Sequence, residues 1–483
     1  MNGPLRRLAV AFMALFALLL VNANYVQVVQ AGRLKRDPHN GRVLLAAYEH
    51  RRGPILAGRT ELALSRATDD RLKYLRSYPG GALYAPVTGF FSLVYGATAM
   101  EQQQNPILSG DDDRLFVSRI GDLLTGRTPE GGAVVVTLDV AAQEAAGRGL
   151  AGKRGAVVAL DPATGAILAL ASSPSYDPNL LSSHDPKAIR SAYARLAKDP
   201  TGPLKNRAIS ETYPPGSLFK VVTAAAALGS GRYTPATRVP SPTRLKLPLT
   251  NRYLSNFGGE SCGDGRTTTL ADALRISCNT AFANVGLSVG APALREQAEA
   301  FGINAGLQVP LAVARSRFPA DPDAPQTALS AIGQYDVRLT PMQAAMIAAG
   351  VANGGVVMRP YLLQEVQTPD LATLDVAQPR ELARATSPEV ADALTSMMKL
   401  VVEAGTGTRA QIDGVAVAGK TGTAQHAEGQ APHAWFIGFA PADHPRVAVA
   451  VLVEEGGGLG SDATGGRVAA PIARDVMAAV LRR

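Results

Sequence analysis

The chain has 483 residues, of which 46% are hydrophobic and 18% are charged, and its formal net charge is +8. This length exceeds one ordinary hydrophobic core and predicts two or three domains, while the apolar content excludes an intrinsically disordered protein. The positive charge is not gathered into a basic stripe and no nucleic-acid-binding motif is visible, so we expect no nucleic-acid partner.

The N-terminus carries an apolar export segment. Residues 8–21 are apolar without interruption, Arg6 and Arg7 precede them, and a softer stretch continues to Val29. The whole segment reaches the roughly 20 residues that a bilayer-spanning helix needs, and no small-residue cleavage site follows the apolar run directly. We therefore expect an uncleaved single-pass anchor over residues 1–33 with its basic end in the cytoplasm and the catalytic part outside the cell membrane. Cleavage just before Gly32 is the alternative.

Two further regions follow the anchor. Residues 34–147 have weak periodicity and many Gly, Pro and Arg residues, which predicts a small β-rich module. Beyond it, two apolar runs at 155–160 and 166–171 flank an Asp-Pro…Gly turn and predict a hairpin. Three short apolar runs near 415–419, 435–440 and 447–453 precede a closing helix at 468–481. Strands at both ends of residues 148–483 with helices between them predict an α+β domain, with one antiparallel sheet flanked by helices.

The first chemical motif is Ser217-Leu-Phe-Lys220, which follows Tyr213-Pro-Pro-Gly. The two prolines and the glycine cannot lie inside a helix, so the helix that Gly229 ends must start near Ser217. The serine then lies at the positive end of the helix, and Lys220 lies one turn further on the same face, where its amine is expected to reach the serine hydroxyl. A buried lysine loses its proton readily, and this pair predicts a nucleophile with its base.

Two more motifs follow in the order that serine acyltransferases without a catalytic histidine require. Ser277 and Asn279 alternate around Cys278, so both polar side chains are expected to face one cleft, with Ser277 relaying a proton and Asn279 holding a substrate amide. Lys420-Thr421-Gly422-Thr423 ends an apolar run as an edge strand would. Gly422 leaves room for a substrate strand, the lysine and both threonines bind a terminal carboxylate, and the N–H groups of Ser217 and Thr423 form an oxyanion hole.

With these motifs the sequence resembles the penicillin-binding proteins, and closely the A-type class B transpeptidases of high-GC Gram-positive bacteria. The likeness extends through Arg52-Gly-Pro-Ile55, through the Ser-Ser-Pro-Ser-Tyr-Asp-Pro-Asn segment from Ser172, and through Ala424-Gln425 and Pro432-His-Ala-Trp435. The resemblance implies a pedestal over 34–147 and a penicillin-binding transpeptidase domain over 148–483. It also implies cross-linking of peptidoglycan stem pentapeptides during septal or cell-shape growth through an acyl-enzyme on Ser217, inhibition by β-lactams, no cofactor or metal, and a SEDS-type glycosyltransferase partner.

Other functions share some of these features. A D,D-carboxypeptidase carries the same three motifs, and the class B-like N-terminal module argues against it. A class A β-lactamase needs a glutamate to activate water, and none occurs from residue 300 to residue 364. A bifunctional synthase would need a glycosyltransferase domain for which the stretch between anchor and catalytic domain is too short. A catalytically silent division scaffold would not need Ser217, Lys220 and Lys420.

Two remaining groups of residues, the cysteines and two histidines, are considered separately. Cys262 and Cys278 are the only cysteines, in a chain expected outside the cell, and they either form a disulfide, which we favour, or stay as free thiols. His426 and His433 flank the third motif but lack the spacing of metal ligands, so we expect them to line the cleft rim or to bind nothing.

Overall fold

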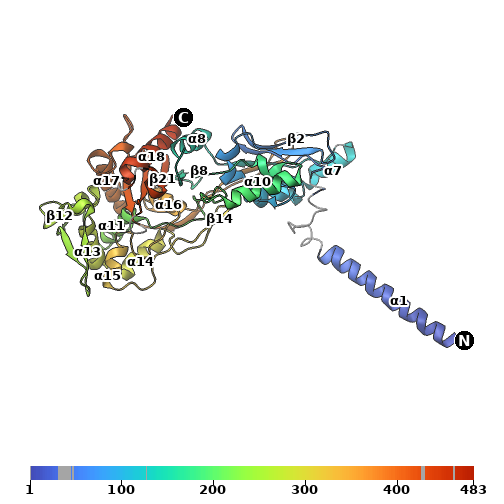
Figure 1. Ribbon diagram of the computed structural model, residues 1–483, viewed down its shortest axis with the longest axis horizontal. Helices are drawn as coiled ribbons and strands as arrows, with labels where there is room; N and C mark the ends of the chain where they lie inside the picture. The colour runs from blue at the N-terminus through green and yellow to red at the C-terminus, as the bar shows by residue number, and fades with distance from the viewer. Residues whose placement is uncertain are drawn as a thin grey trace.

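The computed structural model describes residues 2–30, 45, 48–126, 128–425, 430–458, 460 and 463–482. Helix α1 (Asn2–Asn24) continues into a π-helical turn, η1 (Tyr25–Val29), and projects as a single rod from the rest of the molecule (Figure 1). Within the described chain, Gly3–Val29 is the one helix long and apolar enough to cross a membrane, and none of it is buried. The expected anchor is therefore a continuous helix whose apolar side chains have no protein to pack against.

A six-stranded sheet forms the core of the N-terminal module, which we call the pedestal. Its strand order is β17-β16-β6-β1-β2-β3, with β1 and β6 parallel and the other neighbours antiparallel. The strands are β1 (Ile55–Ala57), β2 (Thr60–Ala67), β3 (Tyr74–Ser77), β6 (Ala133–Val136), β16 (Leu363–Gln367) and β17 (Thr373–Val376). Short helices surround the sheet: α4 (Ala85–Thr88), α5 (Ala99–Gln103), α6 (Asn105–Ser109), α7 (Phe116–Thr125), α9 (Asn179–Ser182) and α10 (Pro186–Lys198).

The pedestal draws on residues that the sequence analysis assigned to the catalytic domain. Strand β16 pairs with β6, with Val366 opposite Val134, and Arg114 forms an ion pair with Asp375 of β17 at 3.0 Å. A pairing between strands more than 200 residues apart leaves no local periodic signal, which is why composition could not reveal it. The expected boundary between residues 147 and 148 falls inside α8 (Val140–Gly149).

The second sheet has five strands in the order β19-β20-β21-β7-β8, all antiparallel. They are β7 (Gly155–Leu160), β8 (Ile167–Ser173), β19 (Ala418–Ala424), β20 (His433–Ala440) and β21 (Val447–Val453). The predicted hairpin and the three predicted C-terminal runs thus meet in one sheet, and the predicted α+β architecture is confirmed.

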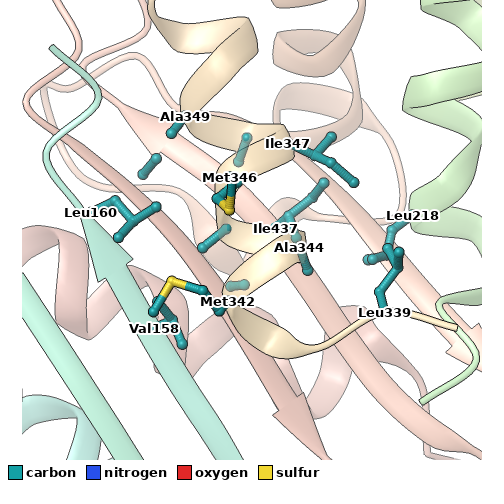
Figure 2. Packing of buried hydrophobic residues seen from close by; sticks show 14 of the residues in the cluster. Val158, Leu160, Leu218, Leu339, Met342, Ala344, Met346, Ile347, Ala349 and Ile437 are labelled. Carbon is teal, nitrogen blue, oxygen red and sulfur yellow. The ribbon is translucent and has the colours of Figure 1, made fainter. Parts of the chain in front are cut away.

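Helices cover both faces of this sheet because its side chains alternate. Val158 of β7 and Ile437 of β20 pack under α16 (Pro341–Ala352), where Met342 and Met346 lie over the strands (Figure 2). The intervening residues, such as Val157, contact α8 and α18 (Gly465–Leu481) on the opposite face. Every residue of β7, β20 and β21 is buried, as a sheet covered on both sides requires.

The remaining helices form a second lobe beside the β19 edge, on the left of Figure 1. They are α11 (Lys220–Gly229), α12 (Leu270–Arg275), α13 (Asn279–Val289), α14 (Ala291–Ala300), α15 (Ala324–Ser330) and α17 (Pro388–Ala404). Two-stranded ribbons lie between these helices: β9 (Arg238–Pro240) with β12 (Thr267–Thr269), β10 (Arg244–Lys246) with β11 (Tyr253–Ser255), β13 (Leu307–Gln308) with β14 (Ala312–Val313), and β15 (Val356–Met358) with β18 (Glu381–Arg384). One further ribbon, β4 (Phe91–Ser92) with β5 (Gly96–Ala97), lies between the pedestal helices α4 and α5 in the chain.

Candidate active site

Ser217 lies on the first turn of the predicted helix, and that turn has 3-10 geometry. The turn η4 (Gly216–Phe219) runs directly into α11. Ser217 is partly exposed, whereas Lys220 is completely buried in the same helix. The serine therefore reaches the surface at the positive end of the helix, while the lysine one turn later is shielded from water.

Close backbone contacts fix the segment that carries Ser217. Gly216 has a φ of +54°, and its N–H donates to the carbonyl oxygen of Gly333 over 3.0 Å. A Cβ atom on Gly216 would lie 2.9 Å from the carbonyl oxygen of Thr423, and one on Gly333 would lie 2.1 Å from that of Gly216. The first motif, the third motif and the loop at Gly333 thus meet backbone to backbone, at a distance that only glycine permits.

The two buried lysines converge on the second motif. The Lys220 amine donates to the Ser277 carbonyl oxygen over 2.6 Å and to Asn279 Oδ1 over 2.7 Å, and lies 3.3 Å from Ser277 Oγ. The Lys420 amine donates to the same Ser277 Oγ over 2.9 Å and to the Thr421 carbonyl oxygen over 3.0 Å. The structure thus brings Ser277, Asn279 and both lysines of the sequence-predicted site into one hydrogen-bonded cluster.

Ser217 stands next to this cluster without joining its hydrogen bonds. We expected its hydroxyl to meet the Lys220 amine, but among the described residues the hydroxyl has no hydrogen-bond partner. The amine is drawn instead to the two oxygens of the second motif, which can only accept hydrogen bonds.

Burial changes the charge of both lysines. It lowers the pKa of Lys420 to about 7. It also lowers the pKa of Lys220 well below its ordinary value, and the nearby Lys420 lowers it further. No carboxylate forms an ion pair with either amine in the described chain. Burial therefore favours the uncharged form of the Lys220 amine, because neither solvent nor a counter-ion stabilises its proton.

A neutral Lys220 amine has two hydrogens and one lone pair. Its short bonds to the Ser277 carbonyl oxygen and to Asn279 Oδ1 use both hydrogens. The lone pair is then free to accept a proton from a hydroxyl group. Asn279 thus orients the base, in addition to any contact that it makes with a substrate.

The third motif lies within β19 rather than at its end. The strand runs four residues beyond Lys420, and it is the edge strand of the five-stranded sheet, as predicted. An added Cβ atom at Gly422 would come within 2.9 Å of the Pro215 carbonyl oxygen and 3.0 Å of the Trp435 Cβ atom. The glycine is therefore needed for packing against the nucleophile segment, a reason that the sequence did not indicate.

Both threonines of this motif already have protein partners. The hydroxyl of Thr421 lies 2.6 Å from that of Thr406, and the hydroxyl of Thr423 accepts from the Gly465 N–H over 3.4 Å. Because side chains alternate along a strand, these hydroxyls lie on the opposite face from the Lys420 side chain.

The second motif is held by residues that sequence reasoning missed. Ser277 has a φ of +64°, in the left-handed region that non-glycine residues rarely adopt, and Asn279 is the first residue of α13. The preceding residue makes no side-chain cap. Instead Asn256 Oδ1, from a distant loop, accepts from the N–H groups of Asn279 over 2.9 Å and Thr280 over 3.1 Å. A cap from so far along the chain has no sequence signature.

Cys262 and Cys278 form a disulfide within the same loop region. Both cysteines are buried, and the bond ties the Asn256 loop to the residue between Ser277 and Asn279. The second motif is therefore attached to this loop by a covalent bond and by a helix cap.

A buried charged network supports the other side of the nucleophile segment. Tyr213 donates to Glu454 Oε1 over 2.7 Å, and Arg207 donates to the same oxygen over 2.9 Å. The Trp435 indole N–H donates to the Pro214 carbonyl oxygen over 3.1 Å. These contacts give the Tyr213 and Trp435 side chains a structural role in holding the segment that precedes Ser217.

Of the two histidines near the third motif, the structure describes only His433. His433 is buried at the start of β20, where its Nδ1 accepts from the Glu455 N–H over 3.2 Å and its ring meets that of Tyr213 edge-on. His426 lies outside the described residues. In the described part of the chain, no group of three or more His, Cys, Asp or Glu side chains could hold a metal ion.

Comparisons with known proteins agree with this geometry. Residues 155–478 match the penicillin binding protein transpeptidase domain, and residues 52–134 match the penicillin binding protein A dimerisation domain. The peptidoglycan D,D-transpeptidase PbpA of Mycolicibacterium smegmatis is 50% identical, over 100% of this chain and 99% of that protein.

Solved structures show the same likeness. The ceftriaxone acyl-enzyme complex of penicillin-binding protein A from M. tuberculosis has a TM-score of 0.87 at 48% identity, covering 90% of this chain and 100% of that one. The D,D-transpeptidase domain of a peptidoglycan glycosyltransferase from Eggerthella lenta has a TM-score of 0.77 at 33% identity, with coverages of 90% and 98%. This chain belongs to the class B penicillin-binding proteins, among the PbpA-like peptidoglycan D,D-transpeptidases.

Proposed function

We propose that the protein cross-links peptidoglycan stem peptides through an acyl-enzyme on Ser217. The observation that carries this proposal is the convergence of two buried amines, both without a carboxylate partner in the described chain, on the Ser277 hydroxyl beside a partly exposed serine. A site that lowers the pKa of a buried lysine favours its uncharged amine, which can remove a hydroxyl proton.

In the acylation step, Ser217 Oγ attacks the carbonyl carbon of the peptide bond between the last two D-alanines. The Ser217 proton moves to the Lys220 lone pair, and the new C–O bond gives a tetrahedral oxyanion. The backbone N–H groups of Ser217 and Thr423 stabilise that oxyanion, in keeping with the close approach of Gly216 to the Thr423 carbonyl.

Collapse of this intermediate breaks the C–N bond. The leaving nitrogen takes a proton that passes from Lys220 through the Ser277 hydroxyl, and free D-alanine departs. Lys420 donates to that hydroxyl and supplies the positive charge that a terminal carboxylate requires.

A second stem peptide completes the reaction. Its amine attacks the acyl carbon, gives its proton to Lys220, and restores the Ser217 hydroxyl when the ester C–O bond breaks. The open edge of β19 is the place where the donor backbone adds as a further strand.

β-Lactams enter the same scheme as donor mimics. Penicillin-binding protein A from M. tuberculosis forms acyl-enzymes with ceftriaxone, imipenem and penicillin G, and it is 48% identical to this chain. We expect Ser217 to open the lactam ring in the same way.

We further propose that α1 remains as the membrane anchor and that a SEDS-type glycosyltransferase supplies the glycan strand. The length and exposure of Gly3–Val29 support the anchor. The match of residues 52–134 to a dimerisation domain leaves no long unassigned stretch for a glycosyltransferase within the pedestal, which supports a separate polymerising partner.

The test uses full-length protein in detergent, with a pentapeptide donor and a stem-like amine acceptor. We expect cross-linked product to exceed the free tetrapeptide acid, whereas a D,D-carboxypeptidase would release mainly the acid. Fluorescent penicillin should label this protein and leave a folded Ser217→Ala variant unlabelled. Equal labelling of both proteins would exclude Ser217 as the nucleophile, and labelling of neither would support a silent scaffold.

A further inference from the structure

A large polar cavity of about 1070 Å³ lies near the nucleophile segment but includes no residue of the catalytic cluster. Its lining contains four arginines and an exposed tyrosine: Arg295, Arg315, Arg317, Arg338 and Tyr335. Ligand pockets of roughly 300–1,000 Å³ hold organic molecules of drug size. The cavity therefore has room for a ligand much larger than a simple inorganic anion.

The arginines bring like positive charges close together, and a negatively charged ligand would stabilise this arrangement. Arg317 and Arg338 face each other in an antiparallel bridge, and their backbone N–H groups donate to each other's carbonyl oxygens over 2.7 and 2.9 Å. Side chains directly opposite in such a bridge project from the same face, and like charges there repel each other. Arg315 lines the same cavity two residues before Arg317, so three guanidinium groups share one wall.

Protein carboxylates neutralise only part of this charge. Arg317 pairs with Asp336, and Arg295 pairs with Glu299 at 2.9 Å. In the described chain, Arg315 and Arg338 have no carboxylate partner, and the lining residue Asp321 has no cationic one. The unpaired groups are thus two guanidiniums and one carboxylate.

The walls of the cavity are joined to the nucleophile segment. Phe318, in the wall beside Arg317, stacks on Phe219 with ring centroids 5.6 Å apart, and Phe219 lies between Ser217 and Lys220. Tyr213 pairs with Leu339 in a second antiparallel bridge. A polymer segment held in the cavity therefore lies next to the chain that carries the nucleophile.

We propose that this cavity is a second binding site for peptidoglycan, one that takes a carboxylate-bearing sugar–peptide unit outside the catalytic cleft. Arg315 and Arg338 bind its carboxylates, Asp321 binds an amine or hydroxyl group, and the Tyr335 ring packs on a sugar face. Tyr335 is 47% exposed and lines the cavity. This site rests on the proposed function, because it takes wall polymer to be the substrate.

The experiment measures binding by calorimetry on full-length protein first acylated with penicillin G, so that the catalytic cleft is occupied. The probe is a soluble disaccharide-tetrapeptide, which lacks the bond that a transpeptidase cleaves. We expect Arg315→Gln and Arg338→Gln each to weaken binding about tenfold, the usual loss for one charge-assisted hydrogen bond. Arg190→Gln removes an exposed arginine on α10 and should leave affinity unchanged.

Two further ligands sharpen the result. The same probe with its carboxylates amidated should bind at least tenfold more weakly, and inorganic pyrophosphate should not displace the probe. Tight pyrophosphate binding would assign the cavity to the phosphates of a lipid-linked precursor and would overturn the carboxylate assignment. Unchanged affinity in Arg315→Gln, an exposed position where folding is not at risk, would also overturn it. A protein that penicillin does not acylate would contradict the proposed function alone, because probe binding can still be measured on it.

Discussion

A cluster in the pedestal and the lysine cluster of the transpeptidase domain both bury charged side chains, but only the pedestal cluster balances them with a carboxylate. In the pedestal, Glu101 accepts from Arg52 and from Arg76, each over 2.6 Å, and Tyr78 donates to it over 3.1 Å. Arg52 also donates to Asn105 and lies over the Phe91 ring. The two arginines lower the pKa of Glu101 although its burial opposes this, so the carboxylate stays charged.

The lysine cluster of the transpeptidase domain lacks such a counter-ion within the described chain. Burial alone lowers the pKa of Lys420, and it is the larger of the two causes that lower the pKa of Lys220. The paired cluster holds its charges and contributes stability, whereas the unpaired cluster gives up a proton and contributes reactivity. Removing a charge should therefore have opposite consequences in the two regions.

The largest expected effect is on acylation by Lys220→Met. The substitution keeps the volume of the side chain but removes the lone pair that accepts the Ser217 proton. We expect penicillin acylation to slow by about 1,000-fold or more, the upper range for loss of a general base. The unfolding free energy should change by only about 1 kcal/mol, because two lost hydrogen bonds are offset by the removal of a buried polar group.

Stopped-flow labelling with a fluorescent penicillin gives the rate, and urea unfolding gives the stability. Lys187→Met removes an exposed lysine of α10 and serves as the matched control. Acylation of Lys220→Met within tenfold of the parent rate would show that another group takes the proton.

Glu101→Gln should have the opposite pattern. It leaves Arg52 and Arg76 buried without their counter-charge, and breaking a buried pair in this way costs about 3–5 kcal/mol. Penicillin acylation of the folded fraction should stay unchanged, because the pedestal holds no group that reacts. Glu130→Gln, which removes one partner of an exposed pair with Arg51, should cost less than about 1 kcal/mol. A stable Glu101→Gln protein would mean that the arginines find other acceptors.

Both clusters should make stability rise with pH, but in separate pH windows. Lys420 has a pKa of about 7 when folded and an ordinary value of 10.5, so between these values the unfolded chain holds a proton that the folded chain lacks. Stability should therefore rise with pH in this alkaline window, by about 1.4 kcal/mol per pH unit for one such lysine. Glu101 has a lowered pKa, so its contribution is complete above the ordinary value of 4.5 and is lost as pH falls below it.

Urea unfolding of full-length protein in detergent between pH 3 and 10 tests both the acid and the alkaline pH window. Lys420→Met should reduce the slope at alkaline pH and leave the acid window unchanged, whereas Glu101→Gln should flatten the acid window alone. Any rise of the unfolding free energy with alkaline pH that remains in Lys420→Met would have to come from Lys220, whose pKa is also lowered.

The sequence predicted those features that depend on neighbouring residues. The helix after Pro214 and Pro215, the hairpin at residues 155–171 and the edge strand with Lys420 all follow from local spacing and turn residues, and the structure contains each of them. The grouping of the three motifs came from their order and from the resemblance to a family rather than from physical derivation.

The missed features depend on contacts between distant segments. Strands β16 and β17 join the pedestal, Asn256 caps α13, and Glu101 of α5 meets Arg76 of β3 and Arg52, which precedes β1. Position 422 requires glycine because the Pro215 carbonyl oxygen, from a distant part of the chain, packs against it. None of these pairs is close in sequence, so no periodic pattern or local motif could reveal it.

The smallest expected effect concerns the Cys262–Cys278 disulfide, which affects the lysine cluster only through the second motif. The bond closes a loop of 16 residues, for which chain entropy predicts a stabilisation of about 3 kcal/mol. Reduction should slow penicillin acylation only a few-fold, because Asn256 still caps α13 and Ser217 and Lys220 keep their own helix. Thiol titration of the denatured, unreduced protein should find no reactive thiol among the two cysteines, and acylation rates before and after reduction should differ by less than tenfold. Adding Asn256→Ala to the reduced protein removes the helix cap as well, and the loss should then exceed the sum of the two single effects. Additive effects would instead show that bond and cap act on Ser277 and Asn279 independently.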